Sequence, residues 1–306
     1  MQNRWVWCLV AAFPLNVFAA GFTFEERPGE FALLRDGKSW LSTYIGPYDE
    51  TQREESYKVF THLYDFAGAA PITKGPGGKY THHRGLFIGW KDTLAEGTDF
   101  DTWHMSNCTQ RHMTWLKAEA HENRAVQSEE ILWCGDDGEP FIKEIRTITA
   151  QSGSNETRIF DFESKLMSMT GGIQLKGDLQ HAGMQVRLAN EVSEHESSTQ
   201  YVLPEGAQEL EDDKVVGAWW VCCSAVVRDQ RYWIIHMTPP GNVGGQPVYS
   251  IRRYARFGAF LETPLNEGMP LDLSFRIVFS QKELDRTACQ ALYDSYAAST
   301  KDTGGD

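Results

Sequence analysis

A regular alternation of apolar and polar residues in the second half of the chain constrains the fold most. Within residues 271–280, large apolar side chains occupy every second position and mostly polar residues lie between them. This period of two is typical of an antiparallel strand with one buried face. Residues 160–166 repeat the pattern. Further β-rich runs, separated by Gly, Pro, Asn and Asp, cover residues 141–149, 184–189, 218–227, 231–237 and 248–261.

Helical periodicity is convincing only near the C-terminus. Ser280 and Glu283 have the spacing of a capping box. Apolar residues then recur at helical intervals, at Leu284, Ala288, Leu292 and Tyr296. The sequence has no strand–helix–strand alternation and no Pro/Gly/Ser-rich linker in its middle. We therefore predict an all-β fold, one antiparallel β-sandwich of two packed sheets over residues 21–298, with one C-terminal helix and a flexible tail at 299–306.

The first residues have the layout of a secretory signal peptide. Arg4 precedes an apolar run from Trp5 to Ala20, which ends on a pair of small residues before Gly21. The run is short for a transmembrane helix, and no other segment reaches that length without charges. We expect residues 1–20 to be removed and the mature protein to be periplasmic or secreted, without an integral membrane segment. An uncleaved N-terminal anchor is the alternative.

Charge excludes one class of partner. The chain has 29 Lys and Arg against 42 Asp and Glu, a formal charge of -13. Nucleic-acid binding is disfavoured, because phosphate backbones attract basic surfaces.

The cysteine pattern supports no metal or redox motif. Five of the 6 cysteines follow the signal segment, and none forms a Cys-x-x-Cys pair. Cys222 and Cys223 are adjacent in an apolar strand, so we expect them on opposite faces as small buried side chains.

The densest group of candidate functional residues lies in a glycine-rich loop at residues 72–85. This loop brings together Lys74, Lys79, His82, His83 and Arg84, just before an apolar strand that ends at Trp90. It lacks the spacing of a phosphate-binding P-loop. A solvated turn with incidental histidines is the alternative to a functional loop.

Three other regions contribute candidates. Residues 99–112 contain Asp101, Trp103, His104 and His112, and residues 178–187 contain His181 and Arg187. The segment from His236 to Tyr249 includes Asn242 in a Pro/Gly loop, and three arginines (252, 253 and 256) follow on the next strand. His62 is a further candidate. His62 and His181, each taken alone, are more often structural histidines held by a hydrogen bond than functional ones, so a functional role requires that these histidines converge in the fold.

These residue types favour acid–base chemistry or metal binding. Histidine exchanges protons near neutral pH, and Arg or Lys stabilises developing negative charge. Several imidazoles with a carboxylate such as Asp101 could instead bind a divalent metal, although no compact metal motif such as His-Glu-x-x-His is present. The cofactor stays open. No Gly-x-Ser-x-Gly motif supports a serine nucleophile.

The segments Thr81–Trp90, His181–Arg187 and Tyr254–Gly258 resemble the PmoA-like family of bacterial proteins, over nearly the whole mature chain. That family is labelled methane oxygenase, but a membrane oxygenase subunit needs spanning helices that this sequence lacks, so we discount methane oxidation. The resemblance implies a secreted or periplasmic β-sandwich protein, often found alongside polysaccharide-degrading enzymes. It implies site residues at His82, His83, Arg84, His181 and Arg187.

Our preferred hypothesis is a periplasmic or secreted carbohydrate-active enzyme that hydrolyses, eliminates or epimerises a glycoside or oxidised sugar. His82 or His83 would act as base or acid, with His104 or His181 as its counterpart. The remaining candidates would bind substrate: Lys74, Arg84 and Arg187 an anionic or developing negative group, Trp90 and Trp103 as ring platforms, and His62, Asp101, His112, His236 and Asn242 as polar contacts. The alternatives are a carbohydrate-binding sandwich without catalysis, and a metal-dependent oxidoreductase with stoichiometric transition metal.

Overall fold

The computed structural model describes residues 21–153 and 157–301. The predicted signal peptide at residues 1–20 and the end of the predicted tail at 302–306 lie outside the described residues.

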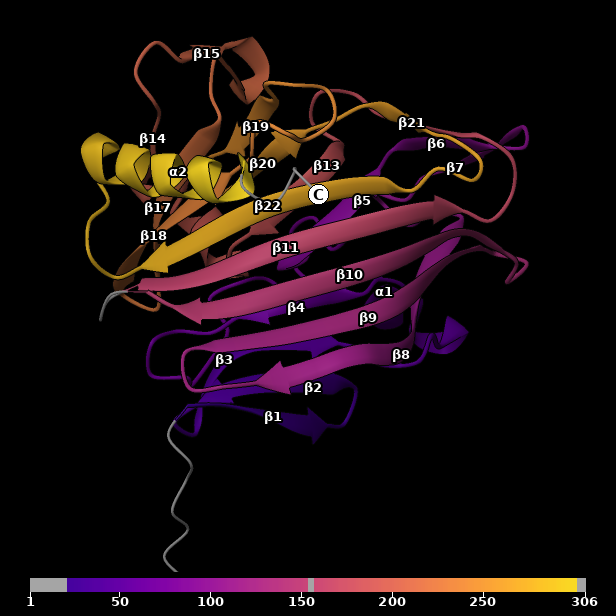
Figure 1. Cartoon of the computed structure of the whole chain (residues 1–306), viewed down its shortest axis with the longest axis horizontal. Helices are drawn as coiled ribbons and strands as arrows, with labels where there is room; N and C mark the ends of the chain where they lie inside the picture. Colours follow the sequence, from indigo (N-terminus) through magenta and orange to yellow (C-terminus); the bar gives the residue numbers. More distant parts are fainter. Residues whose placement is uncertain (1–20, 154–156, 302–306) are drawn as a thin grey trace, which may run out of the picture.

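Two large antiparallel sheets form the body of the molecule, as Figure 1 shows. The first sheet has 10 strands in the order β1-β2-β3-β4-β5-β13-β20-β19-β16-β15. Their bounds are β1 Phe22–Arg27, β2 Glu30–Arg35, β3 Lys38–Tyr44, β4 Phe60–Leu63, β5 Leu86–Trp90, β13 Ala182–Arg187, β20 Arg256–Phe260, β19 Val248–Arg252, β16 Lys214–Val216 and β15 Gln208–Leu210.

The second sheet has 8 strands in the order β14-β17-β18-β22-β11-β10-β9-β8. Their bounds are β14 Gln200–Val202, β17 Trp220–Val227, β18 Gln230–Met237, β22 Leu271–Ser280, β11 Thr157–Ser168, β10 Pro140–Ser152, β9 Arg124–Gly135 and β8 Cys108–Ala120. The strands β8 to β11 are long and run side by side across the front of Figure 1.

A small third sheet of 4 strands, in the order β21-β12-β6-β7, lies at one end of the molecule. Its strands are β21 Thr263–Leu265, β12 Ile173–Lys176, β6 Asp92–Ala95 and β7 Thr98–Phe100. Five short helical elements lie between the strands of the described chain: η1 Glu50–Gln52, α1 Arg53–Ser56, η2 Asn190–Glu194, η3 Glu196–Ser198 and η4 Glu211–Asp213. The long helix α2, Arg286–Lys301, follows the last strand.

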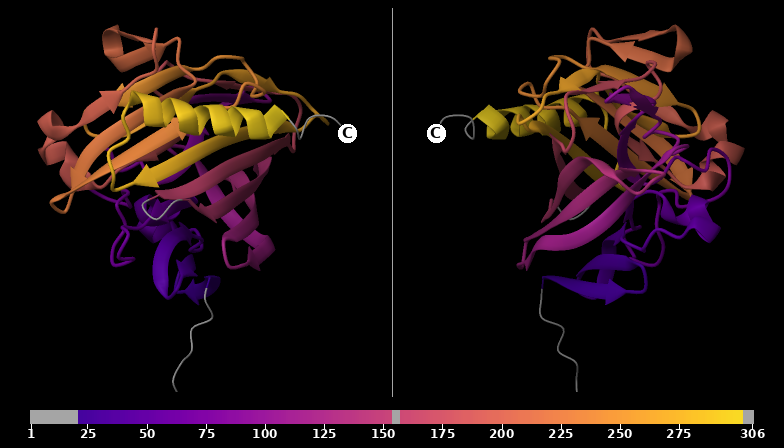
Figure 2. Two further views of the ribbon diagram at one scale, coloured as in Figure 1. Left: turned by 60° about the vertical axis from the view of Figure 1, so that its left-hand side comes forward. Right: turned by 90° about the vertical axis from the view of Figure 1, so that its right-hand side faces the viewer.

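The apolar faces of the two large sheets meet in one core, which confirms the predicted β-sandwich. Ile88 from the first sheet and Phe160 and Phe275 from the second belong to the same cluster of buried side chains. Strand β22 alternates buried and more exposed residues up to Ile277, as its sequence predicts. Figure 2 shows the two layers from the side.

The C-terminal helix is also confirmed, but its predicted start is wrong. The helix α2 begins at Arg286, and the Asp285 side chain accepts a hydrogen bond from the Ala288 amide at 2.8 Å, as an N-terminal cap does. Ser280 instead ends β22 and closes a tight turn with Lys282. The helix continues to Lys301, so residues 299–301 belong to it rather than to the tail.

The helix α2 packs on the outer face of the second sheet (Figures 1 and 2). Cys289 and Tyr293 of the helix share a cluster with Cys222 of β17, whereas Cys223 points into the main core. The two neighbouring cysteines therefore face opposite sides of the sheet, as expected. All five cysteines of the described chain are buried thiols without a disulfide.

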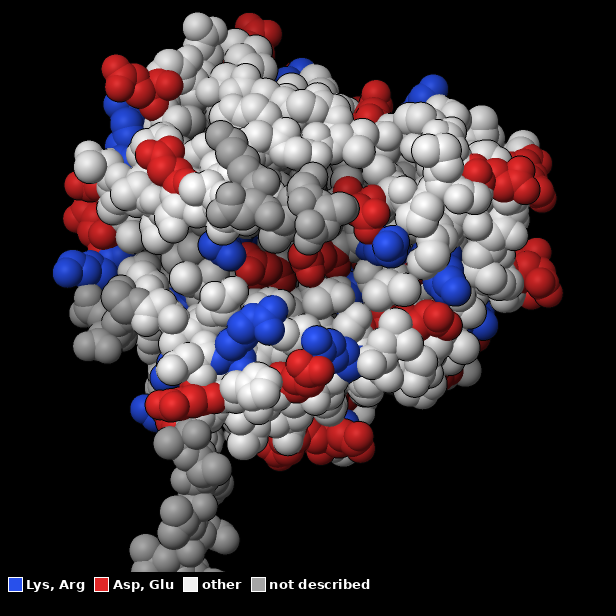
Figure 3. All heavy atoms as spheres, in the orientation of Figure 1, with Lys and Arg blue, Asp and Glu red and all other residues white. Residues whose placement is uncertain are grey.

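The face over the second sheet carries both signs of charge. Figure 3 shows acidic and basic side chains interspersed on it, without a continuous basic patch. Among the described residues, no helix combines the length and apolar character needed to cross a membrane.

Candidate active site

Three chain segments that are far apart in sequence bring histidines to one place. The connection between β4 and β5 carries His82 and His83, the connection between β7 and β8 carries His104, and the turn between β12 and β13 carries His181. The ring centroids of His82 and His104 are 4.4 Å apart, and those of His104 and His181 are 5.1 Å apart. The convergence on which the sequence hypothesis depended therefore occurs for these residues. We call His82, His104 and His181 the histidine cluster.

The loop that carries His82 and His83 is fixed by buried cations. Lys74 donates hydrogen bonds to the backbone carbonyls of Gly75, Gly77 and His83. Arg84 donates to the carbonyl of Glu54 at 2.7 Å. Both side chains are buried, at 3% and 1% exposure. They therefore hold the loop, and their predicted contact with substrate gains no support from their position.

Gly78 explains the glycine content of this loop. Its φ of +68° lies in the left-handed region, and a Cβ there would lie 2.1 Å from the Asn190 amide nitrogen. A side chain at this position would therefore strain the left-handed backbone and displace the Asn190 side chain of η2.

Two histidines of the cluster are held by the same local device. In Asp101-x-x-His104 and Asp178-x-x-His181, the carboxylate contacts Nδ1 of the histidine three residues later, at 2.8 Å and 2.6 Å. Each Asp also accepts a backbone amide hydrogen bond from within its own turn. A carboxylate on Nδ1 fixes the ring orientation and leaves Nε2 for other contacts. The i,i+3 spacing of Asp and His is visible in the sequence and could have identified both pairs.

The carboxylates of these pairs stay ionised. Partial burial alone would raise the pKa of Asp101, but hydrogen bonds from the His104 ring and amide lower it overall. Burial likewise acts to raise the pKa of Asp178, and the Gln180 amide and His181 outweigh it. Each pair thus combines a negative charge with an imidazole that it can stabilise in the protonated form.

Burial favours the neutral form of His82, His83 and His181. Burial, followed by the positive charge of Lys58, lowers the pKa of His82 to about 2. Burial, with Arg256 next, places the pKa of His83 well below its ordinary value. Burial lowers the pKa of His181 too, although Asp178 opposes the shift. Neutral imidazoles can accept protons or hydrogen bonds from a ligand.

Lys58, which the sequence analysis did not single out, lies beneath the cluster. It is 1% exposed, and its ammonium donates to the Trp103 carbonyl at 2.6 Å and approaches the His82 carbonyl at 3.4 Å. Burial, with Arg84 adding to it, lowers its pKa to about 7. Nothing in its local sequence marks it, because the burial comes from loops distant in sequence.

The cluster opens into a pocket of about 460 Å³. This size suits a small ligand or one or two sugar rings. Tyrosine rings, histidines and charged groups line it together, and its lining comprises Tyr80, His82, His83, His104, Gln180, His181, Glu196, Asp213, Arg252, Arg253, Tyr254 and Arg256. Tyr254, whose ring lies 4.9 Å from that of Tyr80, is a further residue that sequence reasoning missed.

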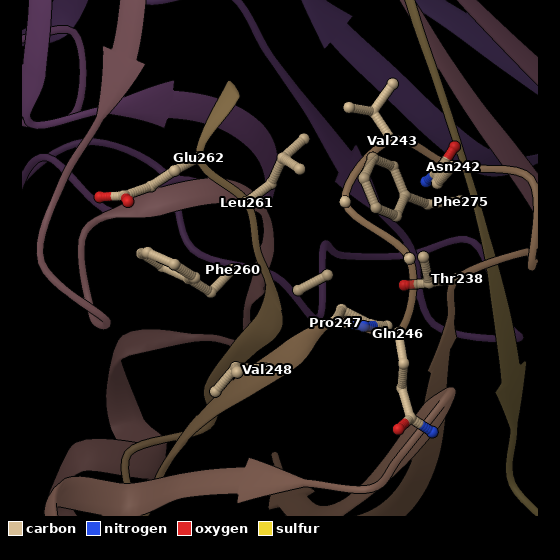
Figure 4. A pocket seen from close by; sticks show the side chains of 13 residues that line it. Thr238, Asn242, Val243, Gln246, Pro247, Val248, Phe260, Leu261, Glu262 and Phe275 are labelled. Carbon is tan, nitrogen blue, oxygen red and sulfur yellow. The ribbon is translucent and has the colours of Figure 1, made fainter. Parts of the chain in front are cut away.

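A second pocket, shown in Figure 4, contains Asn242. It measures about 240 Å³ and is lined largely by apolar side chains such as Phe260, Leu261 and Phe275. The Asn242 amide group is bound to the backbone of Ser274, which fixes the loop. This pocket has no histidine and no basic residue in its lining, so we place the candidate active site at the histidine cluster.

Two predicted ring platforms are enclosed. Trp90 and Trp103 are both 0% exposed. The Trp90 indole donates to the Leu261 carbonyl at 2.7 Å, and Trp103 supports His181 and His83 from below, at centroid distances of 5.6 Å and 5.9 Å. Neither ring presents a face to a ligand in this structure, so the platform prediction is wrong for both.

Other predicted contact residues lie outside the cluster. His112 is bound to the buried carboxylate of Glu129 on the second sheet. His236 is fully buried against Tyr249, and His62 is held by the Thr73 hydroxyl beside the loop. The structure gives all three a structural hydrogen bond or packing contact. Arg187 lies close to the pocket, with its guanidinium 4.8 Å from the Tyr254 ring centroid.

In residues 21–153 and 157–301, no group of three or more His, Cys, Asp or Glu side chains is arranged to hold a metal ion. The divalent metal that the sequence allows stays a prediction.

Comparison with protein families gives one match. The model of a family described as being of unknown function, DUF6807, matches residues 30–294. No curated protein matches the chain significantly.

Three solved structures are remotely similar to this chain. One is a mutant of the heparan sulfate lyase HepC from Pedobacter heparinus, with a TM-score of 0.43 and 10% identity over 86% of this chain and 37% of that one. Another is a GalM/aldose epimerase homologue from C. elegans, with a TM-score of 0.34 and 9% identity over 86% of this chain and 98% of that one. A putative kojibiose phosphorylase from the human microbiome has a TM-score of 0.34 and 9% identity, over 85% of this chain and 32% of that one. The chain spans well under half the length of the lyase and the phosphorylase.

Proposed function

This chain belongs to the DUF6807 family of unknown function, and we propose that it is a carbohydrate-active enzyme whose chemistry is proton transfer at the histidine cluster. One observation carries the proposal. Two imidazoles, each with an ionised carboxylate on Nδ1, lie beside a third imidazole that stays neutral, at the edge of a pocket large enough for a sugar.

We assign the proton transfers to His104 and His181. A carboxylate on Nδ1 raises the basicity of Nε2 and stabilises the imidazolium formed when Nε2 accepts a proton. In hydrolysis, elimination and epimerisation alike, one group takes a proton from water or from a sugar carbon. A second group, which starts as the imidazolium, gives the proton on its Nε2 to the departing oxygen or to the carbon. The Asp101–His104 and Asp178–His181 pairs supply two such groups 5.1 Å apart by ring centroid.

His82 receives a different role. A pKa of about 2 makes it a weak proton acceptor near neutral pH, so we assign it to hydrogen bonding a sugar hydroxyl. His83 is 2% exposed and lines the pocket floor, where neither ring nitrogen has a hydrogen-bond partner in the described chain. It would contact a ligand only in the deepest part of the pocket.

The mixture of aromatic and polar groups supports a sugar ligand. Tyr80 is 42% exposed, and its ring and that of Tyr254 meet on one side of the pocket. Aromatic rings with polar edges suit ligands that have an apolar face and a rim of hydroxyls. Gln180 and the histidines supply the complementary hydrogen-bond donors and acceptors.

The place of action that we propose is the periplasm or the cell exterior. This proposal rests on the signal-like sequence of residues 1–20 alone.

Incubation with a panel of oligosaccharides, followed by mass spectrometry of the products in D₂O, tests the proposal and separates the reaction classes. Hydrolysis adds a water to the products, elimination leaves an unsaturated sugar, and epimerisation at a C–H bond keeps the chain length and introduces deuterium. The H181A variant should lose the product, while H121A, which changes an exposed histidine in the turn between β8 and β9, should keep it. Binding of an oligosaccharide without any product would favour a non-catalytic binding protein instead.

A further inference from the structure

In the lining of the pocket, arginines outnumber carboxylates. The lining contains two carboxylates, and each already has a cationic partner: Asp213 pairs with Arg252, and Glu196 pairs with Lys79 at 3.1 Å. Arg253 and Arg256, the other two arginines of the lining, are left without a carboxylate on the pocket wall. The pocket therefore has a surplus of positive charge.

Arg256 is a buried member of this surplus. It is 1% exposed, and one of its terminal nitrogens donates to the neutral side chains of Gln185 and Ser250, at 3.1 Å and 2.9 Å. Its Nε has no hydrogen-bond partner within the part of the chain that the structure describes. A buried guanidinium that faces only neutral partners is electrostatically unsatisfied.

Arg187 adds a second such charge just behind the pocket. It is 0% exposed, and its Nη2 donates to the Ser193 hydroxyl at 2.7 Å. Its Nε and Nη1 have no hydrogen-bond partner among the described residues. Burial is the main cause that lowers its pKa to about 10, and Arg256 adds to the shift. Tyr254 separates it from the pocket and packs on its guanidinium.

Of the three arginines without a carboxylate partner, Arg253 is the one that a ligand can reach. It is exposed, and its Nη1 donates to the Thr199 carbonyl at 3.2 Å, which restricts where the guanidinium lies on the pocket lining. A planar guanidinium binds carboxylate or sulfate oxygens through paired N–H groups. Arg256 in the same lining and Arg187 against Tyr254 add to this attraction, because buried charges are screened less than exposed ones.

We propose that the pocket binds a sugar carrying an anionic substituent, a carboxylate or a sulfate, whose charge lies against Arg253 and above Arg256. This inference deepens the proposed function and rests on it for the sugar, but the anion site is testable without turnover. The sugar ring then extends toward the histidine cluster, which lines the same pocket.

The test measures the thermal stability of the full chain with small probes. Sodium D-glucuronate and sodium sulfate are compared with D-glucose and sodium chloride at matched concentration and ionic strength. The proteins are the wild type, R253A and, as a matched control, R124A, which changes an exposed arginine at the start of β9. We expect glucuronate or sulfate to raise the Tm of the wild type and of R124A, and R253A to bind the same anion about tenfold more weakly.

Each outcome decides the proposal. A shift with glucuronate alone identifies a carboxylate, and one with sulfate alone identifies a sulfate ester. No specific shift with either anion, or a shift that R253A retains in full, overturns the anion site. If the anion site holds but no oligosaccharide is converted, the proposed enzymatic function fails alone. If neutral oligosaccharides are converted and no anion binds, the anion site fails alone.

Discussion

The Asp178 carboxylate and the His181 ring form one closed turn, with Oδ1 2.6 Å from Nδ1. Asp101 and His104 repeat the arrangement at 2.8 Å in a loop more than 70 residues earlier in the printed sequence. Two copies of the same local device, brought together by the fold, give the pocket a pair of oriented imidazoles. The predictions for catalysis depend on these two turns.

Replacing Asp178 by Asn should reduce turnover strongly and leave ligand binding nearly intact. The amide keeps the size of the side chain but removes the charge that stabilises an imidazolium at His181. General acid–base catalysis contributes about 10²- to 10⁴-fold, so we expect a fall in kcat of at least about 10²-fold with a small change in KM. Steady-state kinetics on the oligosaccharide found in the panel measure both values.

The control for this substitution is E122Q, which removes an exposed carboxylate in the turn between β8 and β9. Equal losses in the two variants, or an unchanged kcat in D178N, would remove His181 from the proton-transfer step.

Stability should fall as the pH decreases below about 6.5, in part because of His82. The pKa of His82 is about 2 in the folded protein against an ordinary value of 6.5, so the unfolded chain binds more protons between these values. At pH 5 the proton bound by the unfolded state would reduce stability by about 1 to 2 kcal/mol relative to pH 7.

Urea denaturation at pH 7 and pH 5 measures this contribution. The H82N variant should lose less stability on acidification than the wild type, whereas H121N should behave like the wild type. Identical pH dependence in H82N and the wild type would contradict the buried, neutral state of His82.

Lys58 should make the stability of the protein depend on pH on the alkaline side of neutrality. Its pKa is lowered to about 7 from 10.5, so the unfolded chain binds more protons between these two values and stability should rise with pH across this window. Going from pH 7 to pH 9 should recover about 2 kcal/mol of the cost of the buried ammonium.

The K58M variant removes this titration, because Met fills similar space without a charge. Denaturant midpoints at pH 7 and pH 9 should therefore diverge less in K58M than in the wild type or in K176M, which changes an exposed lysine at the end of β12. A larger alkaline gain in K58M than in the wild type would show that Lys58 is not the titrating group.

The start of α2 offers a test of the fold itself. Asp285 accepts a hydrogen bond from the Ala288 amide at the start of α2, so D285A should lower the free energy of unfolding by about 1 kcal/mol. S280A should leave the start of the helix unchanged. Circular dichroism during urea denaturation compares the two variants. If S280A lost helix signal and D285A did not, Ser280 would be the helix cap, as the capping-box spacing predicts.

The sandwich itself could be predicted because its strands carry their own pattern. Alternation in residues 160–166 and 271–280 reports which face is buried, and that information is local. The start of α2 was misplaced because a Ser-x-x-Glu spacing also fits a turn, and only the end of β22 shows that Ser280 is still in the sheet.

The candidate site was predicted in part. His82, His104 and His181 could be found because histidine and carboxylate density is visible in the sequence, and the Asp-x-x-His spacing was available to refine it. Lys58 and the surplus charge of Arg187 and Arg256 could not be found, because whether a cation has a partner depends on distant segments. Trp90 and Trp103 were misassigned for the same reason, since burial of a tryptophan at a strand end or in a loop is decided by what packs over it.

The most direct test of the central claim is a comparison of turnover and binding in the D101N/D178N double variant. Calorimetric titration gives affinity for the converted oligosaccharide, and product formation gives the rate, both at pH 7 beside the wild type. The account predicts affinity within a few-fold of the wild type and no measurable product, because both oriented imidazoles lose their carboxylates while the pocket walls stay in place. Wild-type rates in the double variant would contradict proton transfer by the histidine cluster.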